Sequence, residues 1–290
     1  MSKAPELRAL GVGEILDVSI KLSLRHFLTF VKIVAVVIIP VGVVNLLILT
    51  STLPDGAVAN EGQLLLPPVN ETGIGRFATG TVISAVLSTM AGLVATGAIF
   101  KALSNAYLSK APKAGASLRF GFTRIHSLLW VSILIAIVVV VGLVLLIVPG
   151  IYLGVAFAVV IPALMLENHR GTAALRRSFR LVKGRWWPSF GVVIVGWFLI
   201  PVIAALIVGL IFEVALMASA DSPTAILSLT TVSNSIATVI TTPFQAAAIT
   251  VLYFDLLVRK EGFDLQLLAA RIDEQAQPTQ AERGGPGTSS

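Results

Sequence analysis

The tripeptide His169-Arg170-Gly171 places an imidazole and a guanidinium at adjacent positions, a pairing that could serve phosphate-ester chemistry. Hydrolysis of a phosphodiester would also need acidic residues that hold a metal ion and a second histidine as acid or base. The other histidines are His26 and His126, and no acidic cluster with metal-ligand spacing accompanies any of the three. We therefore expect no catalytic residue, no cofactor and no metal site. A membrane hydrolase stays an alternative that a cleft joining His169 to two carboxylates would revive.

The composition indicates an integral membrane protein. Of the 290 residues, 56% are hydrophobic and only 12% are charged, about half the charged fraction of a soluble globular protein. A chain this apolar could not keep its surface wetted. Cysteine is absent, which excludes disulfides and thiolate chemistry. The net charge of +6 would suggest a nucleic-acid partner only in a soluble protein, so no nucleic acid is expected here.

Six apolar runs are long enough, at about 20 residues each, to cross the hydrocarbon core as helices. Their approximate limits are 28–50, 77–102, 127–148, 151–167, 188–216 and 229–257. Pro149-Gly150 separates the third run from the fourth, so residues 127–167 could instead form one kinked helix. With a hairpin there, every Lys and Arg except Arg76 falls on the side of the two termini. The positive-inside rule makes this side the cytoplasm.

Three of the predicted cytoplasmic segments look alike, each a short amphipathic stretch that leads into an odd-numbered span. They are EILDVSIKLSLRHF, SLRFGFTRIHSLLW and TAALRRSFRLVKGRWW. In the first, Leu16, Ile20, Leu24 and Phe27 share one face at helical spacing. The first and third also share a pattern, Ser19-Ile20-Lys21-Leu22 against Ser178-Phe179-Arg180-Leu181. The expected architecture is three repeats, each a cytoplasmic amphipathic helix plus a transmembrane hairpin.

The third amphipathic stretch is the most basic. Helices of this kind lie among lipid headgroups, with their cations near anionic phosphates and Trp residues in the interfacial belt. The candidate lipid- or partner-binding residues are Arg176, Arg177, Arg180, Lys183, Arg185, Trp186 and Trp187. The alternative is that these helices only set the topology and pack under the bundle.

Polar residues inside the predicted spans form a second candidate site. Glu213, near the outer end of the fifth span, is either an interfacial carboxylate or an ion or proton site. Asn234 and Thr238 belong to a polar stripe along the sixth span. These features support an alternative function, a transporter or lipid-translocating protein. A water-filled cavity lined by Asn234 and Thr238 would favour it, and a dry bundle would remove it.

Three stretches carry a resemblance to a known family. PGIYLGVAFAVVIPALMLENHRGTAALRRSFRLVKGRWW resembles the most recognisable block of the glycerophosphoryl diester phosphodiesterase membrane domain family, and GEILDVSIKLSLRHF and TPFQAAAITVLYFDLLVRKEGFDLQLL are similar to its end blocks. The resemblance implies a bacterial multi-pass membrane protein. Some members carry a soluble phosphodiesterase domain after this one. We expect none here, so the resemblance carries over no catalytic residue.

We therefore expect an all-α membrane domain over residues 1–270 and a disordered cytoplasmic tail at 271–290, rich in Gln, Gly, Pro and Ser. Its expected location is the cell membrane, with both termini in the cytoplasm. The expected function is non-catalytic: a module that engages phospholipids, anionic headgroups above all, or a protein partner.

Overall fold

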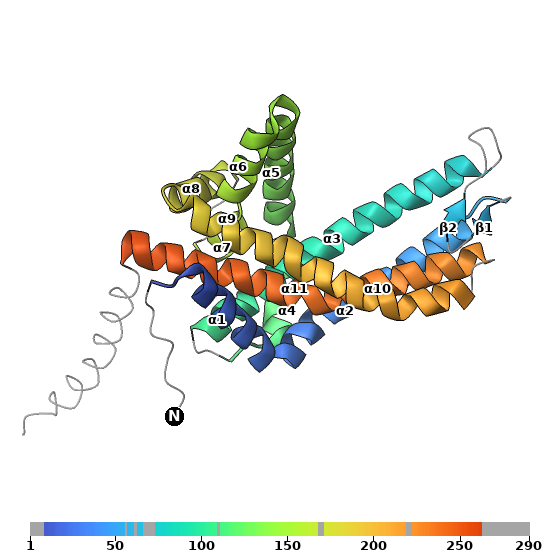
Figure 1. The fold of residues 1–290 in the computed structure, drawn as a ribbon, viewed down its shortest axis with the longest axis horizontal. Helices are drawn as coiled ribbons and strands as arrows, with labels where there is room; N and C mark the ends of the chain where they lie inside the picture. Colours follow the sequence, from blue (N-terminus) through green and yellow to red (C-terminus); the bar gives the residue numbers. More distant parts are fainter. Residues whose placement is uncertain are drawn as a thin grey trace, which may run out of the picture.

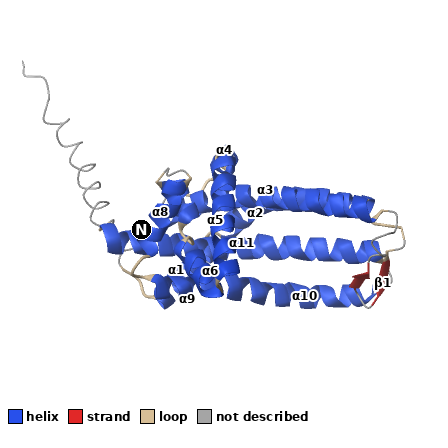
Figure 2. Ribbon diagram, turned by 90° about the horizontal axis from the view of Figure 1, so that it is seen from above, coloured by secondary structure: helices blue, strands red, loops and turns tan. Residues whose placement is uncertain are grey.

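The computed structural model describes residues 9–55, 57–60, 63–65, 73–108, 111–167, 171–218 and 222–262. Apart from one small antiparallel β-hairpin, the regular elements there are helices (Figures 1 and 2). The helices are α1 (Val12–Arg25), α2 (Phe27–Ser51), α3 (Ile74–Tyr107), α4 (Ala114–Thr123), α5 (Ile125–Leu145), α6 (Ile147–Ala156), α7 (Val160–Leu166), α8 (Thr172–Val182), α9 (Trp186–Ile194), the π-helical turn η1 (Val195–Leu199), α10 (Ile200–Ala218) and α11 (Pro223–Glu261). The strands are β1 (Val58–Asn60) and β2 (Gln63–Leu65), which the sequence did not predict. The predicted tail at 271–290 lies outside the described residues.

Six helical segments in the described chain are long and apolar enough to cross a membrane, which is consistent with the expected multi-pass membrane protein. They are Phe27–Ser51, Ile74–Tyr107, Ile125–Leu145, Ile147–Leu166, Trp186–Glu213 and Pro223–Glu261. The predicted limits lie within a few residues of these bounds. Many of their apolar side chains remain exposed, as helices need when lipid covers them.

The third and fourth of these segments form a hairpin and not one kinked helix. The chain reverses at Leu146, whose backbone is extended, so the break comes three residues before the predicted Pro149. Pro149 lies in the first turn of α6, where its missing N–H costs no helical hydrogen bond. Glycine is required at the turn because a Cβ at Gly150 would stand 2.5 Å from the Leu143 side chain.

Four long helices, α2, α3, α10 and α11, run along a common direction, and the β-hairpin lies at one end of them (Figures 1 and 2). Helices α1 and α8 lie at the opposite end, together with the last turns of α11. The first described residues and the end of α11 are therefore on the same side of the molecule. The α5–α6 hairpin differs from the other four helices, because it projects to one side of them.

Proline also shapes the fifth segment. Pro201 has no N–H to donate to the carbonyl four residues before it, and its ring would crowd that carbonyl. The helix widens just before it into η1, where the Ile200 N–H donates to the Val195 carbonyl five residues back. The segment continues as α10 beyond this widening.

Helix α11 is the centre of the fold. Every residue from Ala246 to Leu257 is buried, against α1, α2, α3 and α10 among others. The helix starts at the N-cap Ser222 with Pro223 in its first turn, and ends at Gly262 with a φ of 59°. Asp255 is 3% exposed and accepts a hydrogen bond from the Leu10 N–H at 2.7 Å. It also pairs with Arg259 at 3.0 Å, one helical turn further along α11.

The three short helices, α1, α4 and α8, pack on α11, α3 and α7 respectively. In each, a fully buried serine precedes an exposed basic residue by two positions; the serines are Ser19, Ser117 and Ser178. On α1 the buried face is Ile15, Ser19 and Ser23, because small serines allow close approach to α11. The predicted apolar face of α1 points elsewhere, with Ile20 and Leu24 exposed.

Candidate functional site

Helix α8 presents three cations to the outside. Arg176, Arg180 and Lys183 recur at helical spacing and are exposed; we call them the cationic face. The opposite side of the helix is buried, against α7, α5, α6 and α11. The apolar side of this amphipathic helix therefore packs against the rest of the protein, and the basic side chains are exposed.

Arg177, which was predicted to belong to the binding group, lies instead in a network of carboxylates. Its guanidinium donates two hydrogen bonds to Glu167, at 2.6 and 2.8 Å, and also bonds Glu261. The Tyr253 hydroxyl donates to the same Glu167 at 2.5 Å. The hydrogen bond to Glu261, and after it the hydrogen bond to Glu167, raises the pKa of the Arg177 guanidinium above its ordinary value. The network joins the end of α7, the middle of α8 and the end of α11.

Lys260 fixes the C-terminal end of α8. Its ammonium donates to the backbone carbonyls of Arg180, at 3.1 Å, and Lys183, at 2.6 Å. These are carbonyls that the end of a helix leaves without an intrahelical donor, and a cation there also suits the helix dipole. Helix α8 is thus held at its middle and at its C-terminal end by residues that include Glu261 and Lys260 near the end of α11.

The remaining predicted residues divide between packing and exposure. The Trp186 indole donates to the Tyr152 carbonyl at 3.2 Å and stacks between the rings of Tyr152 and Phe190. Arg185 is half-buried, and its Nε has no hydrogen-bond partner among the described residues. Trp187 is 75% exposed. The structure therefore places Trp187 on the outside with the cationic face, and Arg177, Arg185 and Trp186 against the protein.

A polar cavity of about 490 Å³ lies between α2, α3 and α11, and we call it the polar cavity. Asn234 and Thr238, the residues named for the transporter alternative, line it, whereas Glu213 does not. Glu213 is exposed on α10. The full lining is Ile38, Val41, Gly42, Asn45, Leu49, Thr81, Ser84, Ala85, Ser88, Ala91, Gly92, Thr231, Asn234, Ser235 and Thr238.

The polar stripe of α11 is explained by this cavity. The hydroxyls of Thr231, Ser235 and Thr238 each donate to a carbonyl four residues back in their own helix, at 2.6 to 2.8 Å. Their donors are thereby satisfied inside the helix, and their oxygens stay available as acceptors. Hydroxyl-bearing residues can thus line a space between apolar helices without leaving a donor unpaired.

Residues of α2 and α3 complete the polar lining, and the sequence prediction missed them. The Asn45 amide donates to the Ser88 hydroxyl at 2.7 Å. The Asn45 amide oxygen and the Ser84 hydroxyl have no partner within the described part of the chain. The signal in the sequence was the pair Ser84 and Ser88, one helical turn apart in the second predicted span.

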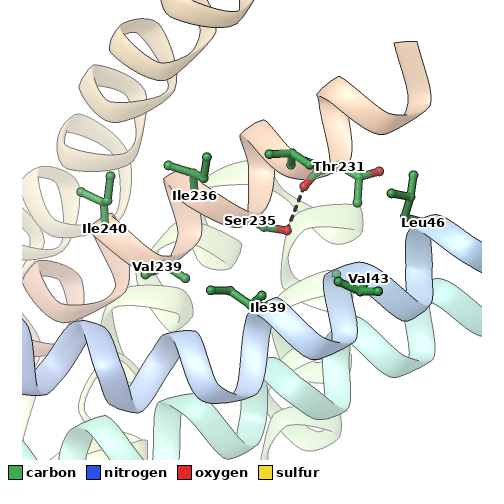
Figure 3. A pocket seen from close by; sticks show the side chains of 10 residues that line it. Ile39, Val43, Leu46, Thr231, Ser235, Ile236, Val239 and Ile240 are labelled. Atoms are coloured by element: carbon green, nitrogen blue, oxygen red, sulfur yellow. Dashed lines mark hydrogen bonds between the residues drawn. The ribbon is translucent and has the colours of Figure 1, made fainter. Parts of the chain in front are cut away.

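Two less polar spaces adjoin the polar cavity. One, of about 260 Å³, shares Ile38, Gly92 and Thr238 with it and extends to Trp197 on η1. The other is an apolar groove of about 300 Å³ between α2 and α11 (Figure 3). There Ile39, Val43 and Leu46 lie on α2, and Ile236, Val239 and Ile240 on α11. The two helices touch between the groove and the polar cavity, since a Cβ at Gly42 would lie 2.8 Å from the Ser235 hydroxyl.

Among the described residues, no group of three or more His, Cys, Asp or Glu side chains could hold a metal ion. His169 and Arg170 lie outside the described residues, so the interpretation of His169-Arg170-Gly171 stays a prediction. Comparison with known proteins found no matching family model, no matching curated protein and no matching solved structure. The resemblance to the glycerophosphoryl diester phosphodiesterase membrane domain family rests on the quoted stretches alone.

Proposed function

We propose that each of the six long apolar segments crosses the membrane and that both termini lie in the cytoplasm. Support comes from the position of the first described residues and the end of α11 on one side of the molecule, with the β-hairpin on the other (Figure 1). Cations on α1 and α8 lie at the first end, as the positive-inside rule requires of a cytoplasmic face. The three buried serines of α1, α4 and α8 support a threefold repeat, because each of them precedes an exposed basic residue by two positions.

Six crossings require the α5–α6 hairpin to run with the other four long helices in the bilayer. The hairpin is predominantly apolar, and side chains near its tip are among the most exposed large apolar residues of the described chain, from 67 to 81% at Val144, Leu146, Ile147 and Val148. Such exposed apolar side chains favour a position of the tip in the interfacial region of the bilayer, where they contact lipid while the turn itself still meets water. The hairpin is connected to the rest of the chain through Arg124 and Phe157–Val159. These residues are not helical, and their backbone determines the direction of the hairpin.

We further propose a non-catalytic function, in which this membrane domain binds anionic phospholipid headgroups at its cytoplasmic end. The cationic face is the observation that carries the proposal. Arg176, Arg180 and Lys183 are exposed on a helix whose apolar side is already covered by the protein. The Arg177 and Lys260 contacts hold that helix in place, so its cations are preorganised for a planar array of phosphates. Exposed Trp187 suits the interfacial belt beside it.

The expected strength follows from the number of cations. Each basic residue near an anionic membrane surface contributes about 1 kcal/mol, so three contribute about 3 kcal/mol. At 1.4 kcal/mol per tenfold change, this corresponds to a preference of roughly 100-fold for an anionic over a zwitterionic lipid at that position. Salt should weaken the preference, because exposed charges are screened within about 10 Å at 0.1 M.

Quenching of tryptophan fluorescence by brominated lipids tests this proposal. The full chain, reconstituted in phosphatidylcholine, is titrated with brominated phosphatidylglycerol or brominated phosphatidylcholine. The triple variant Arg176→Gln, Arg180→Gln, Lys183→Gln should lose most of the preference for phosphatidylglycerol. The matched control Arg176→Lys, Arg180→Lys, Lys183→Arg keeps the charges and should keep the preference. An unchanged preference in the glutamine variant would refute headgroup binding at this face.

A second candidate function, lipid translocation or transport, is favoured by the polar cavity. The cavity has the lining that this alternative demanded, Asn234 and Thr238, and lies between helices proposed to span the membrane. An assay with proteoliposomes that contain fluorescent phospholipids would test it. Movement of the fluorescent lipid from one leaflet to the other should be faster with the protein than in protein-free vesicles. Absence of protein-dependent transfer would leave headgroup binding as the only proposed activity.

A further inference from the structure

The polar cavity is placed where polar groups are costly. Its walls are α2, α3 and α11, three of the apolar helices proposed to cross the membrane. A hydroxyl or amide that loses its water without gaining a partner costs about 1–3 kcal/mol. Polar side chains that gather around a common space in such helices therefore indicate that something polar fills it.

Ser84 carries the strongest indication. Its side chain is 93% shielded, at a relative exposure of 7%, and it lines the cavity from α3. Its hydroxyl has no hydrogen-bond partner within the described residues, and neither has the Asn45 amide oxygen on the facing α2. The wall of the cavity thus contains one buried free donor and one buried free acceptor, beside the acceptor oxygens of the α11 hydroxyls.

The lining also restricts the charge of the ligand. None of its side chains is charged, so neither an anion nor a cation would find a counter-charge there, and burying an unpaired charge is strongly unfavourable. A ligand that donates and accepts hydrogen bonds without a charge fits the lining, and hydroxyl groups do both. The volume of about 490 Å³ lies in the range of small-molecule sites.

Access to the cavity is from the side. Asn234 and Thr238 are exposed although they line it, so the space opens between helices. The adjoining space, which shares Ile38, Gly92 and Thr238, is lined mostly by apolar residues such as Leu93, Phe100 and Ile249. A molecule with a hydroxyl-bearing end and an apolar tail could place the two ends in the two spaces.

We propose that the polar cavity binds a neutral, hydroxyl-bearing ligand through Ser84, Asn45 and the α11 hydroxyls. The ligand is the uncharged end of a lipid or a free polyol. This site is separate from the cationic face, and it names the ligand class for the cavity on which the second candidate function rests. Its occupation does not depend on headgroup binding by α8.

Binding is measured by native mass spectrometry and ligand-induced thermal stabilisation of the detergent-purified full chain. The probes are 1,2-dioctanoylglycerol, its 3-O-methyl ether and glycerol. The wild type should bind dioctanoylglycerol at least tenfold more tightly than the methyl ether, which lacks the donor. Saturable binding of glycerol alone would identify a free polyol as the source of the hydroxyls.

Two kinds of variant locate the site. The double variant Asn45→Ala, Ser84→Ala leaves the cavity no smaller and removes the free donor and acceptor, so it should weaken binding at least tenfold. Gly92→Leu fills the junction of the two spaces, because a Cβ there meets nothing within 4 Å. Gly209→Leu, on α10, is its matched control, since a Cβ there also meets nothing and Gly209 does not line either space.

The variants decide between the site and non-specific association. Loss of probe binding in the double variant and in Gly92→Leu, with wild-type binding in Gly209→Leu, supports the proposal. Absence of binding of both hydroxyl probes to the wild type, or equal binding to all variants, would overturn it. Retention of the phosphatidylglycerol preference in the same variants separates that failure from a failure of the cationic face.

Discussion

Replacing Arg177 with methionine should destabilise the protein markedly, whereas the same change at Arg176 should not. The Arg177 side chain is 12% exposed and Glu167 is 21% exposed, so their two hydrogen bonds are largely shielded from solvent. Charge-assisted hydrogen bonds contribute about 1.5–3 kcal/mol each, and removing one partner of a buried pair costs about 3–5 kcal/mol. Glu261 is 37% exposed, so its pair with Arg177 adds little. We expect a loss of about 3 kcal/mol for Arg177→Met.

The assay is thermal unfolding of the detergent-purified chain, followed by intrinsic tryptophan fluorescence. A loss of about 3 kcal/mol corresponds to a Tm lower by roughly 6 °C for a chain of this size. Arg176→Met is the control, because the Arg176 side chain is exposed, and substitutions of exposed residues change the stability by about 0.5 kcal/mol or less. The double variant Arg177→Met, Glu167→Gln should be more stable than Arg177→Met alone, since it also removes the charge of Glu167, which has lost its two hydrogen bonds from Arg177.

Equal Tm values for Arg177→Met and Arg176→Met would refute this reasoning. Such a result would mean that Arg177 is not held by the carboxylates in solution and belongs with the cationic face after all. A double variant that is no more stable than Arg177→Met would show that the carboxylate left behind is solvated.

Two further changes test the packing. Gly150→Val should open the α5–α6 turn at a cost of about 1–3 kcal/mol, because its Cβ would stand 2.5 Å from Leu143; Gly154→Val, where a Cβ meets nothing, should be close to neutral by thermal unfolding. Asp255→Ala should release Leu10 from α11, so backbone amide exchange of the N-terminal segment, measured by mass spectrometry, should become faster. Unchanged exchange would mean that other contacts hold that segment.

Features of the fold that depend on neighbouring residues were predicted from the sequence. The length of an apolar run is a local property, so all six long segments were placed within a few residues. The pairs Asp17–Lys21, at 2.7 Å, and Asp255–Arg259 are local in the same sense, because a helix brings residues i and i+4 together. The break before α6 was displaced because Pro149 is tolerated in a first turn, and the chain reverses earlier, at Leu146.

Features that depend on contacts between distant segments were not predicted. Nothing in the local pattern separates Arg177 from Arg176, since both lie in one basic run; Glu261, 84 residues away, separates them. Likewise Asn234 and Thr238 were noted as polar in an apolar span. The other polar residues that line the same cavity, such as Asn45 and Ser84, come from other helices. Periodicity assigns residues to a face of a helix, and only the packing decides what that face meets.

Accessibility of single cysteines tests the six-span arrangement most directly, and the chain has no cysteine to remove. Val58→Cys lies on the β-hairpin, Val148→Cys near the tip of α5–α6, and Ala173→Cys on α8; all three side chains are exposed. A membrane-impermeant maleimide applied to intact cells should label the first two and reach Ala173→Cys only after permeabilisation. Labelling of Ala173→Cys in intact cells, or protection of Val148→Cys from the outside, would contradict six crossings with the cationic face in the cytoplasm.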